Sequence, residues 1–496
     1  MALRVYDTLS QRKQLFEPLV PGKVGMYVCG VTVYDRCHIG HARVYVAFDT
    51  IARYLGRMGY EVTYVRNFTD VDDKIIKRAL EEGVDSRELA DRYIASFHDD
   101  MAALKVAPVQ REPRVTDHID DIIGVIERII DSGHGYVVDG EVFFDVESLE
   151  GYGQLSKRKL DEMQAGASDR VSVDERKRNP ADFVLWKASK PGEPHWDSPW
   201  GQGRPGWHIE CSAMAGRHLG GTFDIHGGGK DLIFPHHENE IAQSTAAHGQ
   251  PPARYWLHNG FVNVKKSEED SDQGEKMSKS LGNFFTIGDV LEHYHPEAVR
   301  LFLLTTHYRS PIVYSTENLE DATRRVEYVY ETLAKMDLVL DAGPSQAAID
   351  EVLRPDLFEE TLRGFNEAMD DDFNTARAIG ELSDLISFLN QLADAKDKAS
   401  KKRRHATFAR AREVLDELAA ILGIFDSPPR EVLQGIRARK LKKISISAEE
   451  VERQIAARDE ARKARDFATA DAIRAKLAAE GVVLMDSAGE TLWKIA

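Results

Sequence analysis

Residues 24–66 constrain the fold of this chain more than any other segment. An apolar run at 24–28 precedes a glycine-containing loop, and apolar side chains at helical spacing then continue from Val44 to Met58 and stop at Gly59. Residues 60–66 predict a second strand after that helix. A strand, a helix and a strand in this order form a βαβ unit, so we expect a parallel sheet of the Rossmann type.

The loop before the predicted helix ends in His38-Ile39-Gly40-His41. The first N–H groups of a helix lack intrahelical partners, and together with the helix dipole they attract phosphate. Gly40 allows a nucleotide to come close, and the imidazoles of His38 and His41 can stabilise charge on its phosphates. Taken alone, the motif is equally compatible with an ordinary helix start that carries two surface histidines.

A second segment, Lys276-Met277-Ser278-Lys279-Ser280, places two lysines around small hydroxyl residues in a polar surrounding. This composition suits a mobile loop whose lysines hold the outer phosphates as charge develops in the transition state. A specific five-residue match arises by accident in roughly one chain in several thousand. The two segments predict ATP binding by His38, Gly40, His41 and Lys279, and catalysis by His38, His41, Lys276 and Lys279.

These two segments resemble the signature motifs of class I aminoacyl-tRNA synthetases. With 496 residues, the chain is too long for one hydrophobic core. We expect an α/β protein with a Rossmann-type parallel-sheet catalytic domain, an inserted connective domain, an α-helical bundle and a small C-terminal anticodon-binding module. The expected boundaries are 1–115 and 206–262 for the two catalytic halves, 116–205 for the insertion, 263–315 for the lysine segment with a stem-contact region, 316–425 for the bundle and 431–496 for the C-terminal module.

The pattern after residue 115 supports this order. Isoleucines at helical spacing from Ile119 to Ile130 predict an amphipathic helix, and residues 137–144 predict a hairpin with an Asp-Gly turn. Residues 150–205 are rich in Lys, Arg, Pro and Gly and are expected to be irregular, before the sheet resumes at 223–226. Helical periodicity predicts the bundle, with helices over 326–340, 376–392 and 411–422 and a proline-containing boundary at 426–430.

The formal net charge of −17 and the pI near 5.5 argue against nonspecific nucleic-acid binding, because phosphate contacts need lysine and arginine. Two basic stretches, 401–404 and 437–443, can still contact phosphate locally or form solvated helix faces. No apolar run of membrane length and no N-terminal export pattern is present, so we expect a cytoplasmic monomer without a membrane partner. The three cysteines, Cys29, Cys37 and Cys211, form no disulfide framework.

Cys29, Cys211, His236 and Glu240 form a candidate metal set. His236 and Glu240 are four residues apart, and Pro235 suits a helix start, so both side chains are expected on one side of a helix. Two thiolates, an imidazole and a carboxylate suit Zn²⁺. The spacing alone leaves another interpretation open, with buried inert cysteines and a helix-start histidine beside an acidic residue.

The segments around this set, 27–35, 207–212 and 234–240, closely resemble those of cysteinyl-tRNA synthetases. The resemblance implies one active-site zinc per chain on Cys29, Cys211, His236 and Glu240, and an amino-acid pocket formed by Thr69, Trp207, His226 and Asp231. Zinc binds a thiolate in preference to a neutral hydroxyl, so such a site can select L-cysteine over serine without an editing domain. The pocket residues also have structural interpretations, as a turn residue, a core tryptophan, a buried histidine and a helix cap, and we expect Cys37 and His237 to be structural.

The resemblance further implies that ATP with Mg²⁺ and cysteine form an adenylate, and that cysteine is then transferred to the 3′ end of its tRNA. Residues 458–477, followed by Gly481 and Trp493, resemble the family's anticodon module, where arginines beside exposed aromatic rings suit unstacked bases. A charged helical hairpin with Trp493 packed inside is equally compatible. The acidic approach to the lysine segment, 265–275, is expected to be a solvated loop.

Three other functions remain open. A ligase of thiol biosynthesis would form the same adenylate but transfer cysteine to an amino sugar, and the long helical C-terminal part argues for tRNA instead. A noncatalytic RNA-binding relative should have lost one signature segment. A zinc-stabilised structural protein leaves the lysine segment unexplained.

Overall fold

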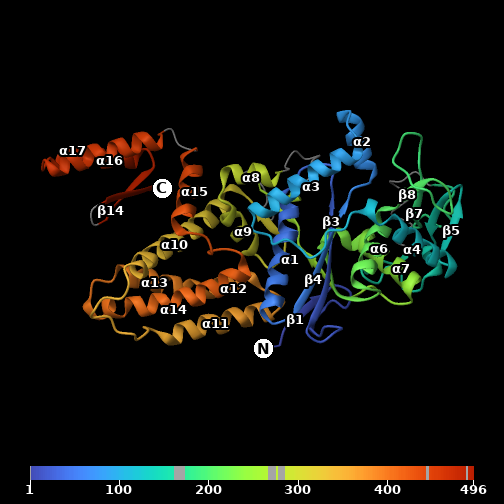
Figure 1. Ribbon diagram of the computed structural model, residues 1–496, viewed down its shortest axis with the longest axis horizontal. Coiled ribbons are helices and arrows are strands. Elements are labelled where there is room, and N and C mark those ends of the chain that lie inside the picture. The colour runs from blue at the N-terminus through green and yellow to red at the C-terminus, as the bar shows by residue number, and fades with distance from the viewer. Residues whose placement is uncertain are drawn as a thin grey trace.

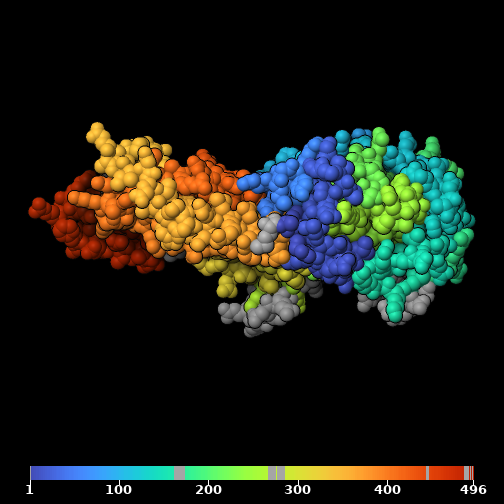
Figure 2. Space-filling model, turned by 90° about the horizontal axis from the view of Figure 1, so that it is seen from below, coloured from blue at the N-terminus to red at the C-terminus, as the bar shows by residue number. Residues whose placement is uncertain are grey.

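The computed structural model describes residues 2–160, 174–265, 275–276, 285–442, 446–487 and 490–495. The molecule is elongated, with β3, β4 and α1 near the middle, residues from about 115 to 250 forming one end, and the C-terminal helices forming the other (Figures 1 and 2). Within the described residues, no helix combines the length and the apolar character needed to cross a membrane.

A four-stranded parallel sheet forms the centre of the catalytic half, in the order β10-β9-β3-β4. Its strands are β3 (Lys23–Thr32), β4 (Glu61–Thr69), β9 (Phe223–Gly229) and β10 (Ala253–Asn259). Helix α1 (Ile39–Arg57) connects β3 to β4, while α6 (Trp207–Leu219) and α7 (Glu238–His248) precede and follow β9. Helices cover both faces, so the strands are nearly continuously buried. The predicted βαβ unit and parallel sheet are confirmed.

After β4 the chain continues with α2 (Asp73–Glu82), α3 (Ser86–Ala103) and η1 (Val115–Asp117), and α4 (Ile119–Asp131) lies in the expected insertion. The predicted hairpin is present as β5 (Gly135–Val138) and β6 (Glu141–Phe144), and Asp139 and Gly140 have positive φ in its turn. The short helix η2 (Val146–Ser148) follows.

The prediction that 150–205 is irregular was wrong in two places. Strands β7 (Phe183–Ala188) and β8 (Gly203–Pro205) extend the hairpin into a four-stranded antiparallel sheet. Leu185 and Trp186 of β7 are fully buried against the insertion core. These strands were hidden because each is short and lies between segments rich in charged residues, Pro and Gly.

A second, smaller sheet leads into the lysine segment. It has the order β12-β11-β13, with β11 (Val262–Val264) antiparallel to β12 (Glu275–Lys276) and parallel to β13 (Ile312–Tyr314). Helices α8 (Ile287–His293) and α9 (Pro296–Leu304) lie between β12 and β13 in the chain. The N-terminal hairpin of β1 (Arg4–Asp7) and β2 (Arg12–Leu15) packs beside β10.

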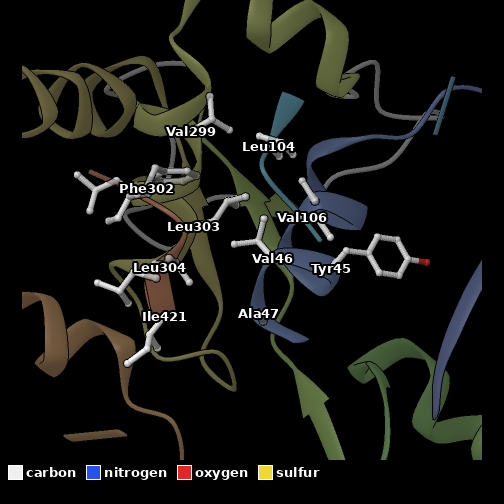
Figure 3. Close-up of a cluster of buried hydrophobic side chains, with 14 of the residues drawn as sticks. Tyr45, Val46, Ala47, Leu104, Val106, Val299, Phe302, Leu303, Leu304 and Ile421 are labelled. Atoms are coloured by element: carbon white, nitrogen blue, oxygen red, sulfur yellow. The ribbon is translucent and has the colours of Figure 1, made fainter. Parts of the chain in front are cut away.

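The helical bundle consists of α10 (Thr316–Asp341), α11 (Pro355–Asp370), α12 (Thr375–Glu381), α13 (Ser383–Asp394) and α14 (Lys398–Leu422). The helix predicted over 376–392 is divided into α12 and α13 at Leu382, whose side chain is buried. The bundle shares one hydrophobic core with the catalytic half. At their junction, Val46 of α1 points toward Leu303 of α9, whereas the Tyr45 ring points to the opposite side (Figure 3).

The C-terminal part has α15 (Pro429–Leu441), α16 (Ala448–Lys463), α17 (Phe467–Ala479), β14 (Val482–Ser487) and β15 (Glu490–Ile495). Residues 446–495 have a small core of their own, in which Trp493 is buried and its indole N–H donates to Glu452 at 2.6 Å. The basic stretch at 437–443 is partly used inside this region, because Arg437 lies over the Trp493 ring at 4.5 Å. The other stretch, 401–404, begins α14, where Arg403 pairs with Glu351 at 2.6 Å.

A buried ion pair joins α1 to α9 beside the core that the catalytic half and the bundle share. Arg300 and Asp49 are almost fully buried and bonded to each other, and Arg300 also donates to the carbonyls of Leu422 and Leu104. One guanidinium therefore connects α9 with α1, with the end of α14 and with the segment after α3.

We expect Asp49→Ala to lower the free energy of unfolding by about 3–5 kcal/mol, because it leaves the Arg300 guanidinium buried without a counter-charge. Urea unfolding followed by circular dichroism measures the loss. Glu417→Ala is the control, because it removes the exposed pair with Arg57 and should cost less than about 1 kcal/mol. Equal losses in the two variants would contradict the view that the buried pair of Arg300 and Asp49 stabilises the protein more than an exposed pair does.

Candidate functional site

A cavity of about 590 Å³ opens at the carboxyl ends of the parallel strands. The strand order reverses between β3 and β9, and open α/β sheets bind their ligands at such a switch point. Elements far apart in the sequence supply its wall. The wall residues include Cys29, Gly30, His38, Gly40, His41, Trp207, Asp231, Asn259 and Gly260.

The two histidines of the first signature cap helix α1. His38 Nδ1 accepts from the Gly40 N–H at 3.0 Å, and His41 Nδ1 accepts from the His38 N–H at 3.3 Å. The rings stack with their centroids 3.8 Å apart. Because both Nδ1 atoms accept, each neutral ring carries its proton on Nε2. The helix start therefore offers two imidazole donors as well as its own N–H groups to a ligand in the cavity.

The second signature enters this region from β12, which ends at Lys276. Met277, Ser278, Lys279 and Ser280 lie outside the described residues, as does most of the acidic approach, 266–274. On the far side of the lysine segment the chain returns to the first signature. The Ile39 N–H donates to Phe285 O at 3.2 Å, and the Ile287 N–H donates to Cys37 O at 2.9 Å. The chain that follows the lysine segment is therefore fixed beside the start of α1.

The four candidate metal ligands come together around Cys29, which lines the cavity. Cys29 comes from β3, Cys211 from α6, His236 from the short helix η4 (Ile233–His237) before α7, and Glu240 from α7. Their ligand atoms all lie within 4.8 Å of one another, and all four residues are buried. Cys29 Sγ is 3.7 Å from Cys211 Sγ, and His236 Nε2 is 3.1 Å from Glu240 Oε1. Pro235 lies in η4 directly after the non-helical residue Phe234, and η4 runs into α7 at Glu238, so His236 reaches Glu240 as expected.

A second donor set overlaps the first. Cys29 and Glu240 also form a group with His226 and His237 within the same 4.8 Å limit. His237 Nε2 is 3.2 Å from Cys29 Sγ. The sequence predicts a structural role for His237, but this position also makes it a candidate ligand. His226 Nε2 is 2.8 Å from Glu240 Oε2, and its other ring nitrogen, Nδ1, is buried without a hydrogen bond. The geometry alone therefore leaves two candidate positions for one metal ion.

Burial controls protonation in this cluster. It raises the pKa of the Cys29 thiol well above its ordinary value, with further contributions from Cys211 and Glu240. Burial also lowers the pKa of His236 to about 3, which leaves the imidazole neutral and able to bind a metal. Burial opposes ionisation of Glu240, but the imidazoles of His226 and His236 bring the pKa of its carboxyl below the usual value. A metal that takes a cysteine sulfur as thiolate here must displace its proton.

The four residues expected to bind the amino acid differ in position. Trp207 is 41% exposed, lines the cavity, and has its ring 4.5 Å from that of His236. Asp231 also lines the cavity, with its carboxylate folded against Gly229. Thr69 and His226 are buried instead behind the wall, where Thr69 donates to Glu210 at 2.7 Å and His226 contacts Glu240.

Several residues that the sequence did not predict hold these groups in place. Glu210 is buried beside Thr69, and burial raises the pKa of its carboxyl well above the ordinary value. His237 Nδ1 is 2.7 Å from His258 Nε2, and His258 Nδ1 is 2.8 Å from Thr8 Oγ1. Glu210 adjoins Cys211 in the sequence, which was a usable signal. Thr8 and His258 gave none, because only the fold brings the N-terminal hairpin to the end of β10.

Comparison with known proteins agrees with this architecture. The family described as tRNA synthetases class I (C) catalytic domain matches residues 15–324. A DALR domain matches 364–426, and the cysteinyl-tRNA ligase anticodon binding domain matches 447–493. The cysteine–tRNA ligases of Geobacter sulfurreducens and Geobacter metallireducens are each 56% identical to this chain, with all of both chains covered. The chain belongs to the cysteine–tRNA ligase family.

A solved structure of similar fold agrees with the fold class. Methionyl-tRNA synthetase of Mycobacterium tuberculosis, in complex with methionyl-adenylate, aligns with a TM-score of 0.59 and 20% identity, covering 83% of this chain and 93% of that one. At this identity the similarity concerns the fold alone. The class I synthetase architecture, with a parallel catalytic sheet followed by helices, is thereby confirmed.

We expect the metal-free protein to bind about one zinc per chain, and Cys29→Ala and Cys211→Ala to abolish tight binding. His236→Ala should abolish it as well, whereas His237→Ala should retain it if the metal binds at the Cys211 set. Competition against a chelator, with elemental analysis of the purified variants, measures these outcomes. Cys37→Ala is the matched control, because this buried thiol lies in the main hydrophobic core. Zinc retained in both Cys29→Ala and Cys211→Ala would refute the assignment.

Proposed function

We propose that this chain activates L-cysteine with ATP to cysteinyl-adenylate and transfers the cysteine to the 3′ end of a cysteine-specific tRNA. One observation carries the proposal: Cys29, which both candidate metal sets share, lines the same cavity as the start of α1. A thiol held near Cys29 and a phosphate held at α1 would therefore belong to ligands that lie side by side. The full-length similarity to cysteine–tRNA ligases supports the same activity.

The donor set fits zinc by its chemistry. Two sulfurs, one neutral imidazole and one carboxylate oxygen are typical zinc ligands, and all are buried within reach of one another. Zinc, when bound, supplies a Lewis acid that favours the thiolate form of a substrate cysteine and distinguishes its sulfur from the hydroxyl of serine. Cys29, Cys211, His236 and Glu240 would hold it.

The cavity wall can orient the rest of the amino acid. Trp207 lies beside His236 and would contact the substrate side chain, while the Asp231 carboxylate would attract its ammonium group. Thr69, held by Glu210, and His226, held by Glu240, would support the pocket from behind. The substrate carboxylate is then left to face the nucleotide.

ATP would bind with its phosphates at the start of α1. The substrate carboxylate attacks the α-phosphorus in line, and pyrophosphate leaves without a covalent enzyme intermediate. His38 and His41 stabilise the charge that develops on the phosphates, and Gly40 leaves the backbone accessible. Lys276 and Lys279 hold the β and γ groups, and Mg²⁺ accompanies the nucleotide as part of the substrate.

The C-terminal part favours tRNA over an amino-sugar acceptor. An anticodon-binding domain of this family matches 447–493, which an enzyme of small-molecule biosynthesis does not need. In this part, Phe467 is 62% exposed at the start of α17, directly after the basic residues Arg462, Lys463 and Arg465. An exposed ring among cationic side chains suits stacking of unpaired bases.

Cysteine-dependent ATP–pyrophosphate exchange, followed by charging of tRNA, tests the proposed function. We expect exchange with L-cysteine, at least about 10⁴-fold weaker exchange with L-serine, and charging of cysteine-specific tRNA. Lys279→Ala should lower the exchange rate about 10²–10³-fold, as removal of one transition-state donor does in other enzymes. Exchange without charging would favour the amino-sugar ligase, and the absence of exchange would reject the adenylation chemistry.

A further inference from the structure

Arg43 is a fully buried arginine two residues after His41 that the adenylation chemistry does not use. It is 1% exposed, and among the described residues no carboxylate pairs with it. Its Nη2 atom donates at 2.9 Å to the carbonyls of both Thr306 and His307, and its Nε is buried without a partner. A buried cation without a counter-charge is costly, so its contact with these two carbonyls calls for an explanation.

The two carbonyls belong to the loop 305–311, which joins α9 to β13. One residue further on, Tyr308 O accepts from the Gly260 N–H at 2.7 Å, and Ile312 N donates to Phe261 O at 2.9 Å. A Cβ on Gly260 would lie 2.3 Å from Ser310 O, so this loop is pressed directly against the backbone of Gly260. Gly260, Phe261 and Val262 line the cavity. Arg43 is therefore one residue away from a contact with the cavity wall.

From this loop, hydrogen-bonded strands lead to the lysine segment. Ile312 of β13 pairs with Val262 of β11, and Asn263 of β11 pairs with Lys276 of β12. Strand β12 carries the first residue of the second signature, and α1 carries the first signature together with Arg43. The two signatures are thus connected through Arg43. The contacts run from α1 to the loop 305–311, then along β13 and β11 to β12. This route is separate from the bonds between 37–39 and 285–287.

We propose that Arg43 is a positioning residue for adenylate formation, which fixes the sheet β12-β11-β13 relative to the start of α1. A guanidinium suits this task because the two N–H bonds of its Nη2 atom are fixed in one plane and reach both carbonyls, whereas a flexible ammonium group has no such fixed geometry. The pocket for the amino acid does not depend on this contact, because Cys29 and Trp207 belong to β3 and α6. The inference rests on the proposed function, since the reaction requires both signatures to act on one ATP.

Pyrophosphate exchange by Arg43→Met and Arg43→Lys tests this role. We expect Arg43→Met to lower kcat about 10–100-fold, the loss that a shift of about 1 Å in a catalytic group causes, with the KM for cysteine changed less than about twofold. Arg43→Lys keeps one donor and should lie between Arg43→Met and the unmodified protein. If Arg43 acts through the lysine segment, Arg43→Met combined with Lys279→Ala should be little slower than Lys279→Ala alone.

Arg53→Met is the matched control. Arg53 lies on the same helix and donates to the carbonyls of Ala420 and Lys105, but these segments do not lead to β11 or β13. It should lose stability without losing kcat. An equal loss of kcat in Arg53→Met, a parallel rise in the KM for cysteine, or full additivity with Lys279→Ala would overturn the proposal.

Hydrogen–deuterium exchange separates this inference from the proposed function, because it needs no activity. Arg43→Met should accelerate amide exchange at 262–264 and 312–314, and leave α14 unchanged. Unchanged protection of both strands would overturn the inference even in an active enzyme. Faster exchange at these strands, in a protein whose unmodified form shows no cysteine-dependent activity, would support the positioning role of Arg43 and reject the proposed function instead.

Discussion

The parallel pairing of β3 with β9 is the constraint on which the rest of the site depends. Both strands end at the same edge of the sheet, at the point where the strand order reverses. Cys29 lies near the end of β3, His226 lies in β9, and the chain leaves β3 to enter α1. One register therefore determines both the candidate metal ligands and the helix start that is suited to phosphate.

The close approach of β3 and β4 contributes to this arrangement. A Cβ at Gly30 would lie 1.5 Å from Asn67 O, so only glycine permits the backbone at this position. The register between the two strands shifts between Val28 and Val31, around the candidate ligand Cys29. Such irregularities re-aim side chains next to sites, and here the affected side chain is shared by both donor sets. The candidate metal ligand Cys29 and the helix start that is suited to phosphate are thus placed by one βα unit.

Periodicity in the sequence predicts most of the architecture, because amphipathic helices and buried parallel strands leave strong local patterns. The βαβ unit was predicted from such patterns, and the hairpin was predicted from the turn residues Asp139 and Gly140. The strands β7 and β8 do not leave such a pattern, because their burial arises from pairing with β6 and with each other. Nor does the break at Leu382, which follows from packing.

The candidate site was predictable only in part. Cys29, Cys211 and Glu240 are too far apart for spacing to unite them, and resemblance to a family supplied the grouping. Sequence position does not decide which of His236 and His237 is the ligand, because they lie four and three residues before Glu240. In the structure both imidazoles approach Glu240 Oε1, at 3.1 and 3.9 Å. Arg43 carried no signal, since its role depends on a loop more than 250 residues away. Lys279 remains a prediction, because it lies outside the described residues.

We propose that a metal held at Cys29, beside the nucleotide site, selects the substrate by its sulfur. X-ray absorption at the zinc edge of the zinc-loaded protein, with and without L-cysteine, tests it most directly. We expect two sulfur ligands in the protein alone, a third at about 2.3 Å when L-cysteine is added, and no change with L-serine. Two sulfurs in every state, or the same change with serine, would contradict it.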